Sequence, residues 1–266
     1  MVVLYICVSI FGLIIGSFLN VVILRFGTGL KISQGRSKCF SCNHELAWYE
    51  LIPLVSYIIQ VGRCRYCGSR ISTQYPLVEV MTAGLFVLSM REIFNFALFD
   101  TVSIVSLVVL LSIMSMYVVI TVYDLRHKMI PDVFSYSVAL LALIFTAVLS
   151  PSSLVLHIAS GVGVFIFFFS FWFFSKGRWM GLGDGKLALS VGFILGPYGT
   201  VAAILIAFWS GAIISLVLVL HERFVNKKLG INMKSEIPFA PFIIFGFLLT
   251  FFLHIDMWTL GAFLAI

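Results

Sequence analysis

The sequence predicts an all-α protein that crosses a membrane about eight times and carries one loop domain outside the lipid. Hydrophobic residues make up 61% of the 266-residue chain, and only 11% of the residues are charged. Long apolar runs recur along the chain, and short polar segments separate them. A chain of this composition must bury itself in lipid, so we expect a polytopic membrane protein.

The first apolar run, 1–24, is expected to form a transmembrane helix. It is too long for a signal peptide, lacks a basic leading region and ends without a small-residue cleavage site. A polar segment, 25–74, follows it, and the rest of the chain, 75–266, is again mostly apolar. The sequence therefore predicts one helix, one loop domain and a seven-helix core.

Basic residues test the number of spans, because Lys and Arg favour loops on the cytoplasmic side of a membrane. With the N-terminus outside, every Lys and Arg except Arg91 falls in a cytoplasmic loop, namely 25–74, 124–132, 176–186 or 222–237. Both termini then lie outside. The pI near 9.1 reflects this topology and attraction to anionic lipid, and it indicates no nucleic-acid partner. The runs after the loop domain are 75–91, 101–123, 133–150, 153–175, 184–196, 198–221 and 238–265.

One predicted span is short. Between Lys186 and the Gly196-Pro197 break lie about ten apolar residues, which as a helix cover roughly half of a hydrocarbon core. The basic residues of 222–237 still require the chain to return to the cytoplasm. We therefore retain this segment as a span that begins inside the preceding glycine-rich loop.

Two Cys-x-x-Cys pairs lie in the loop domain, and they predict a metal centre. Cys39 and Cys42 form the first pair, and Cys64 and Cys67 form the second. This is the ligand pattern of a tetrahedral four-thiolate zinc site, which is structural because no position stays open for water. The alternatives are two disulfides or four free thiols, and a reducing cytoplasm argues against disulfides. The loop has too little apolar material for a core, so metal would supply its folding energy.

Two aspartates stand at the cytoplasmic ends of predicted spans. Asp124 ends the third span and Asp184 opens the sixth, so the two side chains can meet. Ionisable groups near the bilayer usually serve a site, and paired carboxylates suggest chemistry with a shared proton. The alternative is two solvated carboxylates that pair with Arg126, Lys128 or Lys186.

Glycine and proline shape the segments around these aspartates. Gly181, Gly183 and Gly185 allow another chain segment or a substrate peptide to approach closely. Pro238 and Pro241 are expected to bend the start of the last span and to help to shape a cleft. Two Gly-x-x-x-Gly pairs, at 12–16 and 192–196, predict close helix packing.

The chain contains GSFLNVVILR (16–25), both Cys pairs, ELIPLVSYIIQVGRCRYC (50–67), YPLVE (75–79), DLRHKMIPD (124–132) and GLGDGK (181–186). In this order, and over nearly the whole chain, these motifs resemble those of the type IV prepilin peptidases. That family consists of aspartic proteases of the bacterial inner membrane, of the GxGD kind, which cleave the basic leader from prepilins after a glycine. The resemblance implies that Asp124 and Asp184 are the catalytic pair and that the four cysteines form the zinc knuckle of bifunctional members.

Many members of this family also N-methylate the new terminal residue with S-adenosylmethionine. Only the resemblance implies that the region between residues 25 and 79 takes part in methyl transfer, because the sequence shows no glycine-rich nucleotide-binding fold. The residues that it implies for methyl transfer are Asn20, Glu50, Gly62, Arg63 and Glu79. Each has a structural alternative: Asn20 bonds within a helix bundle, Gly62 and Arg63 form a turn of a zinc knuckle, and Glu79 caps the first turn of the second span.

Three alternatives remain open at this point. The first is a peptidase without methyl transfer, and the second is a non-enzymatic zinc-stabilised subunit or ion-coupled transporter. The third is a presenilin-type protease, because Tyr123 and Asp124 match the Tyr-Asp dipeptide of such proteases. A transporter usually places charges near the midplane and often shows an internal repeat, and neither feature is visible here. We expect a prepilin or pseudopilin as substrate, and the sequence does not define an oligomeric state.

Overall fold

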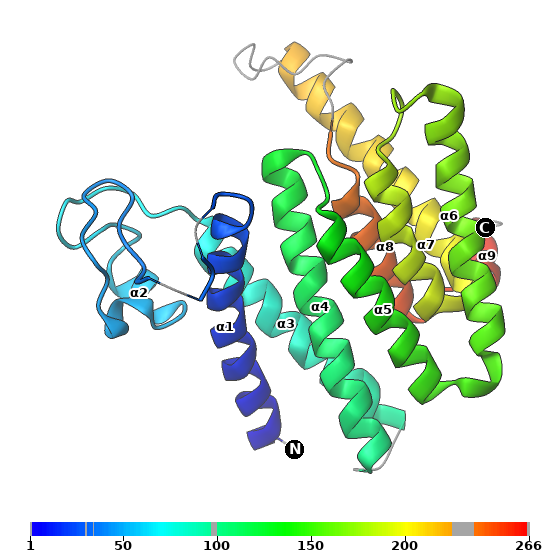
Figure 1. Ribbon diagram of the computed structural model, residues 1–266, viewed down its shortest axis with the longest axis horizontal. Coiled ribbons are helices and arrows are strands. Elements are labelled where there is room, and N and C mark those ends of the chain that lie inside the picture. Colours follow the sequence, from blue (N-terminus) through cyan, green and yellow to red (C-terminus); the bar gives the residue numbers. More distant parts are fainter. Residues whose placement is uncertain (1, 30, 34, 97–99, 225–236, 265–266) are drawn as a thin grey trace. The chain divides into compact units, whose positions relative to one another are not determined.

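The computed structural model describes residues 2–264 except for residues 30, 34, 97–99 and 225–236. Every long regular element in the described residues is a helix, which confirms the all-α class (Figure 1). The chain divides into two compact units, Met1–Val119 and Ile120–Ile266, and helix α4 (Thr101–His127) contributes residues to both. The expected division into 1–24, 25–74 and 75–266 remains a prediction.

In the first unit, α1 (Val2–Arg25) packs along α3 (Gln74–Phe96) through small residues (Figure 1). A Cβ atom added to Gly12 would lie 2.6 Å from Cα of Ala83, and one added to Gly16 would lie 2.7 Å from Cα of Glu79. The two backbones therefore approach closely only because these positions lack side chains, as the Gly-x-x-x-Gly pair predicts.

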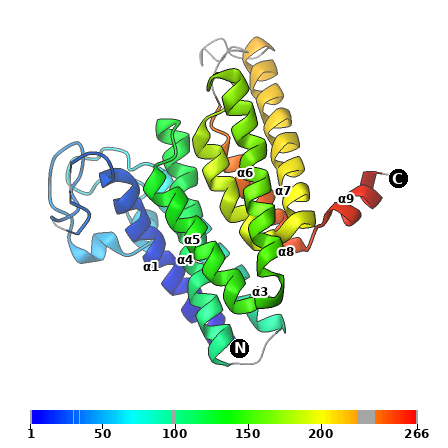
Figure 2. The same ribbon diagram turned by 45° about the vertical axis from the view of Figure 1, so that its right-hand side comes forward.

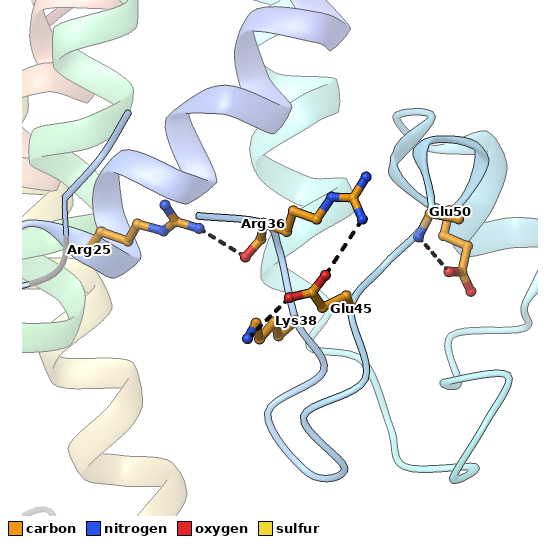
Figure 3. A network of polar contacts seen from close by, with 6 residues as sticks. Arg25, Arg36, Lys38, Glu45 and Glu50 are labelled. Atoms are coloured by element: carbon orange, nitrogen blue, oxygen red, sulfur yellow. Dashed lines mark hydrogen bonds and ion pairs between the residues drawn. The ribbon is translucent and has the colours of Figure 1, made fainter. Parts of the chain in front are cut away.

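The segment between α1 and α3 contains the short helices η1 (Trp48–Leu51) and α2 (Val55–Ile59). Arg25, at the end of α1, donates to the backbone carbonyl of Arg36 at 3.3 Å (Figure 3). It also donates to the backbone carbonyl of Lys31 at 3.0 Å. Glu45 forms ion pairs with Arg36 at 3.5 Å and with Lys38 at 3.3 Å. These ion pairs are exposed and stabilise the segment only weakly.

The second unit contains α5 (Asp132–Leu149), η2 (Pro151–Ser153), α6 (Leu154–Ser175), α7 (Leu182–Phe224), α8 (Ala240–Leu253) and α9 (Met257–Leu264). Helices α6 and α7 lie side by side in both views (Figures 1 and 2). Gly192 of α7 faces Gly161 of α6 so closely that a Cβ atom on Gly192 would collide with Cα of Gly161. This contact confirms close packing at the second glycine pair.

Helix α7 turns back on itself at Gly196, where the backbone leaves the helical region with φ 66° and ψ −172°. The first half runs down α6 and the second returns along it, because Phe168 contacts both Gly185 and Phe208 (Figures 1 and 2). The expected spans 184–196 and 198–221 are therefore the two halves of α7.

Pro197 explains the hydrogen bonding at this reversal. Proline has no N–H, so it cannot bond to the carbonyl of Phe193 four residues earlier. That carbonyl instead accepts a hydrogen bond from Oγ1 of Thr146 at 2.6 Å, and Nδ1 of His157 lies 3.0 Å from it. Side chains of α5 and α6 thus satisfy the carbonyl that the proline leaves free.

Five helices within the described residues are long and apolar enough to cross a membrane, which supports a multi-pass membrane protein. They are α1, α4, α5, α6 together with η2, and α7 counted as one. Helix α3 carries Glu79, Arg91 and Glu92, and α8 has only 14 residues. The count of eight spans therefore remains a prediction.

The expectation of one continuous helix over 238–265 is wrong. Helix α8 ends at Leu253, and His254 adopts a left-handed conformation with φ 52°. Asp256 then begins α9, because its carboxylate accepts the N–H of Thr259 at 2.8 Å, while Oγ1 of Thr259 accepts the N–H of Asp256 at 2.8 Å. This reciprocal cap favours a new helix start over continuation of α8.

Gly192→Ala should destabilise the second unit by about 1–3 kcal/mol, because the added methyl group forces α6 and α7 apart. Gly163→Ala is the matched control, since a Cβ atom there meets nothing within 4 Å. Denaturant unfolding in detergent measures both variants. Equal stabilities would show that the α6 and α7 backbones are not held in close contact.

Candidate functional site

Asp124 and Asp184 lie within the same compact unit, and both are buried. Asp124 occupies the last turn of α4 and is 4% exposed, whereas Asp184 occupies the first turn of α7 and is 9% exposed. The two lie near enough for the charge of Asp124 to act on Asp184. The fold thus brings together two carboxylates that are 60 positions apart in the sequence.

The N-terminus of α8 meets Asp124. The backbone N–H of Ala240, the first residue of α8, donates to Oδ2 of Asp124 at 3.2 Å. The first N–H groups of a helix have no partner within the helix, and the positive end of the helix dipole favours a carboxylate. The sequence does not predict this role of Ala240, although the flanking Pro238 and Pro241 indicate that the chain bends there.

Glycines around Asp184 allow the start of α7 to fit between its neighbours. A Cβ atom on Gly183 would lie 3.2 Å from Cβ of Ile130, and one on Gly185 would lie 3.1 Å from Cβ of Phe168. The backbone of Gly181 also contributes a hydrogen bond to the Asp184 carboxylate. The predicted close approach is therefore an approach of protein segments on both sides of Asp184.

Lys186 does not pair with either aspartate of the buried pair. Its ammonium lies 2.6 Å from Oδ1 of Asp132, at the start of α5. The sequence alternative that pairs Lys186 with Asp184 is therefore wrong. Residues two apart on a helix point in different directions, so Lys186 and Asp184 face different neighbours.

The four loop cysteines converge, although they come from two separate segments. Their sulfur atoms all lie within 4.8 Å of one another, and the Sγ atoms of Cys39 and Cys67 are 3.8 Å apart. A tetrahedral Zn²⁺ with bonds of about 2.3 Å places its sulfur ligands about 3.8 Å apart. The geometry therefore fits a four-thiolate metal site, and it is too open for a disulfide between these two residues.

Both cysteine pairs sit in turns of the same backbone design. In the first turn, the N–H of Cys39 donates to the carbonyl five residues later, and its carbonyl accepts the N–H four residues later, at 3.0 and 2.9 Å. Cys64 makes the equivalent bonds, both at 2.9 Å. The fourth residue after each leading cysteine is left-handed, Asn43 with φ 57° and Gly68 with φ 69°.

Two of the four cysteines have a lowered pKa, which favours the thiolate form that binds metal. Hydrogen bonds from the backbone of Cys42 and then of Ser41 lower the pKa of Cys39 to about 6. The Ser69 side chain lowers the pKa of Cys67. The pKa of Cys42 is instead raised to about 11: a hydrogen bond from the His44 backbone lowers it, but burial and bonds with the neighbouring cysteine side chains outweigh that effect. Cys7 lies apart from this cluster, exposed on α1.

Asn20 and Glu79, two of the residues implied for methyl transfer, both lie where α1 meets α3. Asn20 is 1% exposed, donates to the carbonyl of Tyr75 at 3.2 Å and accepts from Gln74 at 3.2 Å. Asn20 therefore bonds between helices, as its structural alternative proposes. Glu79 does not cap its own helix: its carboxylate accepts the N–H of Leu54 at 2.8 Å and ties the loop to α3.

Glu50 is a buried carboxylate within the loop. Its Oε2 accepts the N–H of Ala47 at 2.9 Å (Figure 3), and its buried Oε1 has no hydrogen-bond partner among the described residues. Gly62, with φ 64°, and Arg63 follow α2 and lead into the second cysteine turn. The first unit thus contains all five implied residues, with Glu79 and Glu50 as its buried acids.

The fold and the site together define a class: a multi-pass helical membrane protein with a buried carboxylate pair and a four-thiol cluster. Two family models match this chain. Residues 10–93 match the bacterial peptidase A24 N-terminal domain, and residues 110–216, which include both aspartates, match the type IV leader peptidase family. The protein belongs to the type IV leader peptidase family, as its motifs predict.

Curated relatives that are named prepilin leader peptidase/N-methyltransferase agree with this assignment. The relative from Bacillus subtilis is 32% identical over 246 residues, 91% of each chain. The relative from Vibrio cholerae is 30% identical over 264 residues, 92% of this chain and 94% of its own. The relative from Myxococcus xanthus is 34% identical over 219 residues, which are 79% of this chain and 62% of that relative. No solved structure matches the chain.

Proposed function

We propose that this protein cleaves the basic leader from type IV prepilins or pseudopilins and then N-methylates the new terminal residue. The observation that carries the proposal is the buried pair of Asp124 and Asp184, inside the segment that matches the leader peptidase family. The names of the relatives support both activities. Membership in a peptidase family argues against the transporter alternative.

The carboxylate pair is suited to peptide hydrolysis. One carboxylate activates water as a base, and the other, carrying the shared proton, protonates the leaving amine. Ala240 helps to orient Asp124 through its N–H, and Gly181 contributes a hydrogen bond to Asp184. We therefore assign both aspartates as catalytic and the two backbone groups as positioning groups.

The location of the site follows from charge. We propose that this end of α4 and α7 lies at the cytoplasmic face of the inner membrane, with both chain termini outside, because basic residues surround the two aspartates. A prepilin would present its basic leader there, with its apolar helix in lipid. The glycines at the start of α7 let Ile130 and Phe168 pack close to the turn that carries Asp184.

The four cysteines would hold a structural zinc ion. Cys39, Cys42, Cys64 and Cys67 supply four sulfur ligands, so the ion would contribute folding energy to the loop. The loop is also held by hydrogen bonds, two isolated β-bridges and exposed ion pairs, but its described residues form no apolar core of their own. Loop order should therefore depend on metal.

Methyl transfer is assigned to the first unit, with S-adenosylmethionine as the methyl donor. The acceptor must be an unprotonated amine, and a free α-amine has a pKa of about 8, so a nearby carboxylate that accepts its proton assists the reaction. Glu50 and Glu79 are buried carboxylates in this unit. We propose that they act with Asn20, Gly62 and Arg63 in this step.

Asp124→Asn or Asp184→Asn should abolish leader cleavage, because each change keeps the shape of the side chain and removes the ionisable group. Asp256→Asn is the control, since Asp256 caps α9 and asparagine caps a helix about equally well. Purified variants are incubated with intact prepilin, and mass spectrometry of the N-terminus reports cleavage. Full-rate cleavage by either variant of the pair would remove that aspartate from catalysis.

Cys39→Ser, Cys42→Ser, Cys64→Ser and Cys67→Ser should each lose about one zinc ion per chain and expose the loop to protease, because metal supplies its folding energy. Cys7→Ser should keep the zinc, since Cys7 lies on α1 outside the cluster. Elemental analysis and limited proteolysis measure the two effects. Undiminished zinc in one of the four variants would exclude that cysteine as a ligand.

The two activities should separate under mutation. Asp184→Asn should still methylate a pilin whose leader is already removed, because methyl transfer needs no hydrolytic carboxylate. Glu50→Gln and Arg63→Ala should lower methylation more than cleavage. Labelled methyl donor and intact prepilin are assayed with the same protein samples. If both rates fall by equal factors in every variant, one shared site performs both reactions.

A further inference from the structure

The start of α7 makes one polar contact that the proposed hydrolysis does not use. The ammonium of Lys186 lies 2.6 Å from Oδ1 of Asp132 and 5.2 Å from the ring centroid of Tyr136, so α5 holds it at two points. The Lys186 side chain is only 14% exposed, whereas that of Asp132 is 61% exposed. A lysine is seldom so enclosed unless it is paired.

This ion pair belongs to a series of contacts between two segments, 124–132 and 181–186. Asp124 and Asp184 interact through their charges, and Ile130 packs against Gly183. Asp132 and Lys186 form the third contact. The same two segments therefore carry both the catalytic pair and a second, opposite-charge pair a few residues further on.

Helix geometry connects the two pairs. Lys186 follows Asp184 by two residues, so its side chain leaves the first turn of α7 in a different direction. A fixed contact on that side limits the rotation and axial movement of the turn. Because Asp184 shares this turn, the ion pair restricts where its carboxylate can lie.

We propose that Asp132 and Lys186 are positioning residues that hold Asp184 in register with Asp124. The inference rests on the proposed peptidase function. Displacement of a reacting group by about 1 Å can lower a rate on the order of a hundredfold, whereas a partly exposed ion pair contributes little to stability. The pair therefore acts mainly on catalysis.

An alternative role for Asp132 is direct binding of basic leader residues, because its carboxylate is mostly exposed. The charged and titratable groups that surround Lys186 and the start of α7 are Asp132 and Tyr136 on α5, Asp124 on α4 and Asp184 on α7. Loss of leader binding would raise KM, whereas loss of register would lower kcat. Steady-state kinetics therefore separate the two roles.

The test uses the full chain in liposomes with intact prepilin. Lys186→Met, which keeps most of the apolar stem, and Asp132→Asn should each lower kcat about ten- to a hundredfold with KM changed less than about twofold. The double variant should be no slower than the slower single variant, because both changes break one interaction. Lys186→Arg should recover most of kcat.

The pH dependence gives a further readout. A less tightly coupled carboxylate pair has apparent pKa values that lie closer together, so the bell-shaped pH profile of kcat should narrow in Lys186→Met. The unfolding temperature should stay unchanged. Lys176→Met is the matched control: Lys176 is an exposed lysine in the same unit, and this variant should keep the wild-type rate and profile.

The proposal is overturned if Lys186→Met keeps the wild-type kcat, if KM alone rises in Asp132→Asn, or if the effects of the single variants multiply in the double variant. Asp184→Asn is assayed in parallel. Inactive Asp184→Asn beside fully active Lys186→Met refutes positioning and leaves the peptidase assignment intact. Active Asp184→Asn refutes the aspartate pair itself, and the positioning role falls with it.

Discussion

The second unit depends on placing two carboxylates out of water. Removing a carboxylate from water costs free energy unless hydrogen bonds replace its hydration. Asp124 receives the N–H of Ala240, and Asp184 receives a hydrogen bond from the Gly181 backbone. Both donors lie at or near helix starts, where backbone N–H groups have no helical partner. The free N–H groups at these helix starts therefore provide hydrogen bonds to the two buried carboxylates.

The reversal of α7 makes this arrangement possible. The first half of α7 lies between the start that carries Asp184 and the turn at Gly196, and it packs on α6 through Gly192. Its second half returns along α6 toward α8, whose first residue meets Asp124. Pro197 lacks an N–H, and two side chains bond to the Phe193 carbonyl that it leaves free. The positions of Asp184 and of the start of α8 therefore depend on this turn.

Local sequence signals predicted the features that depend on spacing or on small size. The Cys-x-x-Cys pairs indicated a cluster, the glycine pairs indicated close helix contacts, and the Gly196-Pro197 break indicated two helical segments. Features that depend on a distant partner gave no such signal. The bonds from Ala240 to Asp124 and from Lys186 to Asp132 join different helices, and sequence patterns around each residue carry no information on which partner the fold supplies. The break at His254 was missed because the apolar run continues through it, and only the cap formed by Asp256 and Thr259 reveals the new helix.

The matching turns around Cys39 and Cys64 have a kinetic consequence. Each turn closes through two short-range backbone hydrogen bonds, and its left-handed residue, Asn43 or Gly68, sets the direction of the chain. Each turn can therefore bring its two thiols together without the other. A metal ion that binds here would meet two preformed bidentate chelators instead of four independent sulfurs, so its capture would pass through a complex with the two sulfurs of one turn. Closing the second turn onto the first would then be an intramolecular step, and its entropic cost would be set by the length of chain between the two turns.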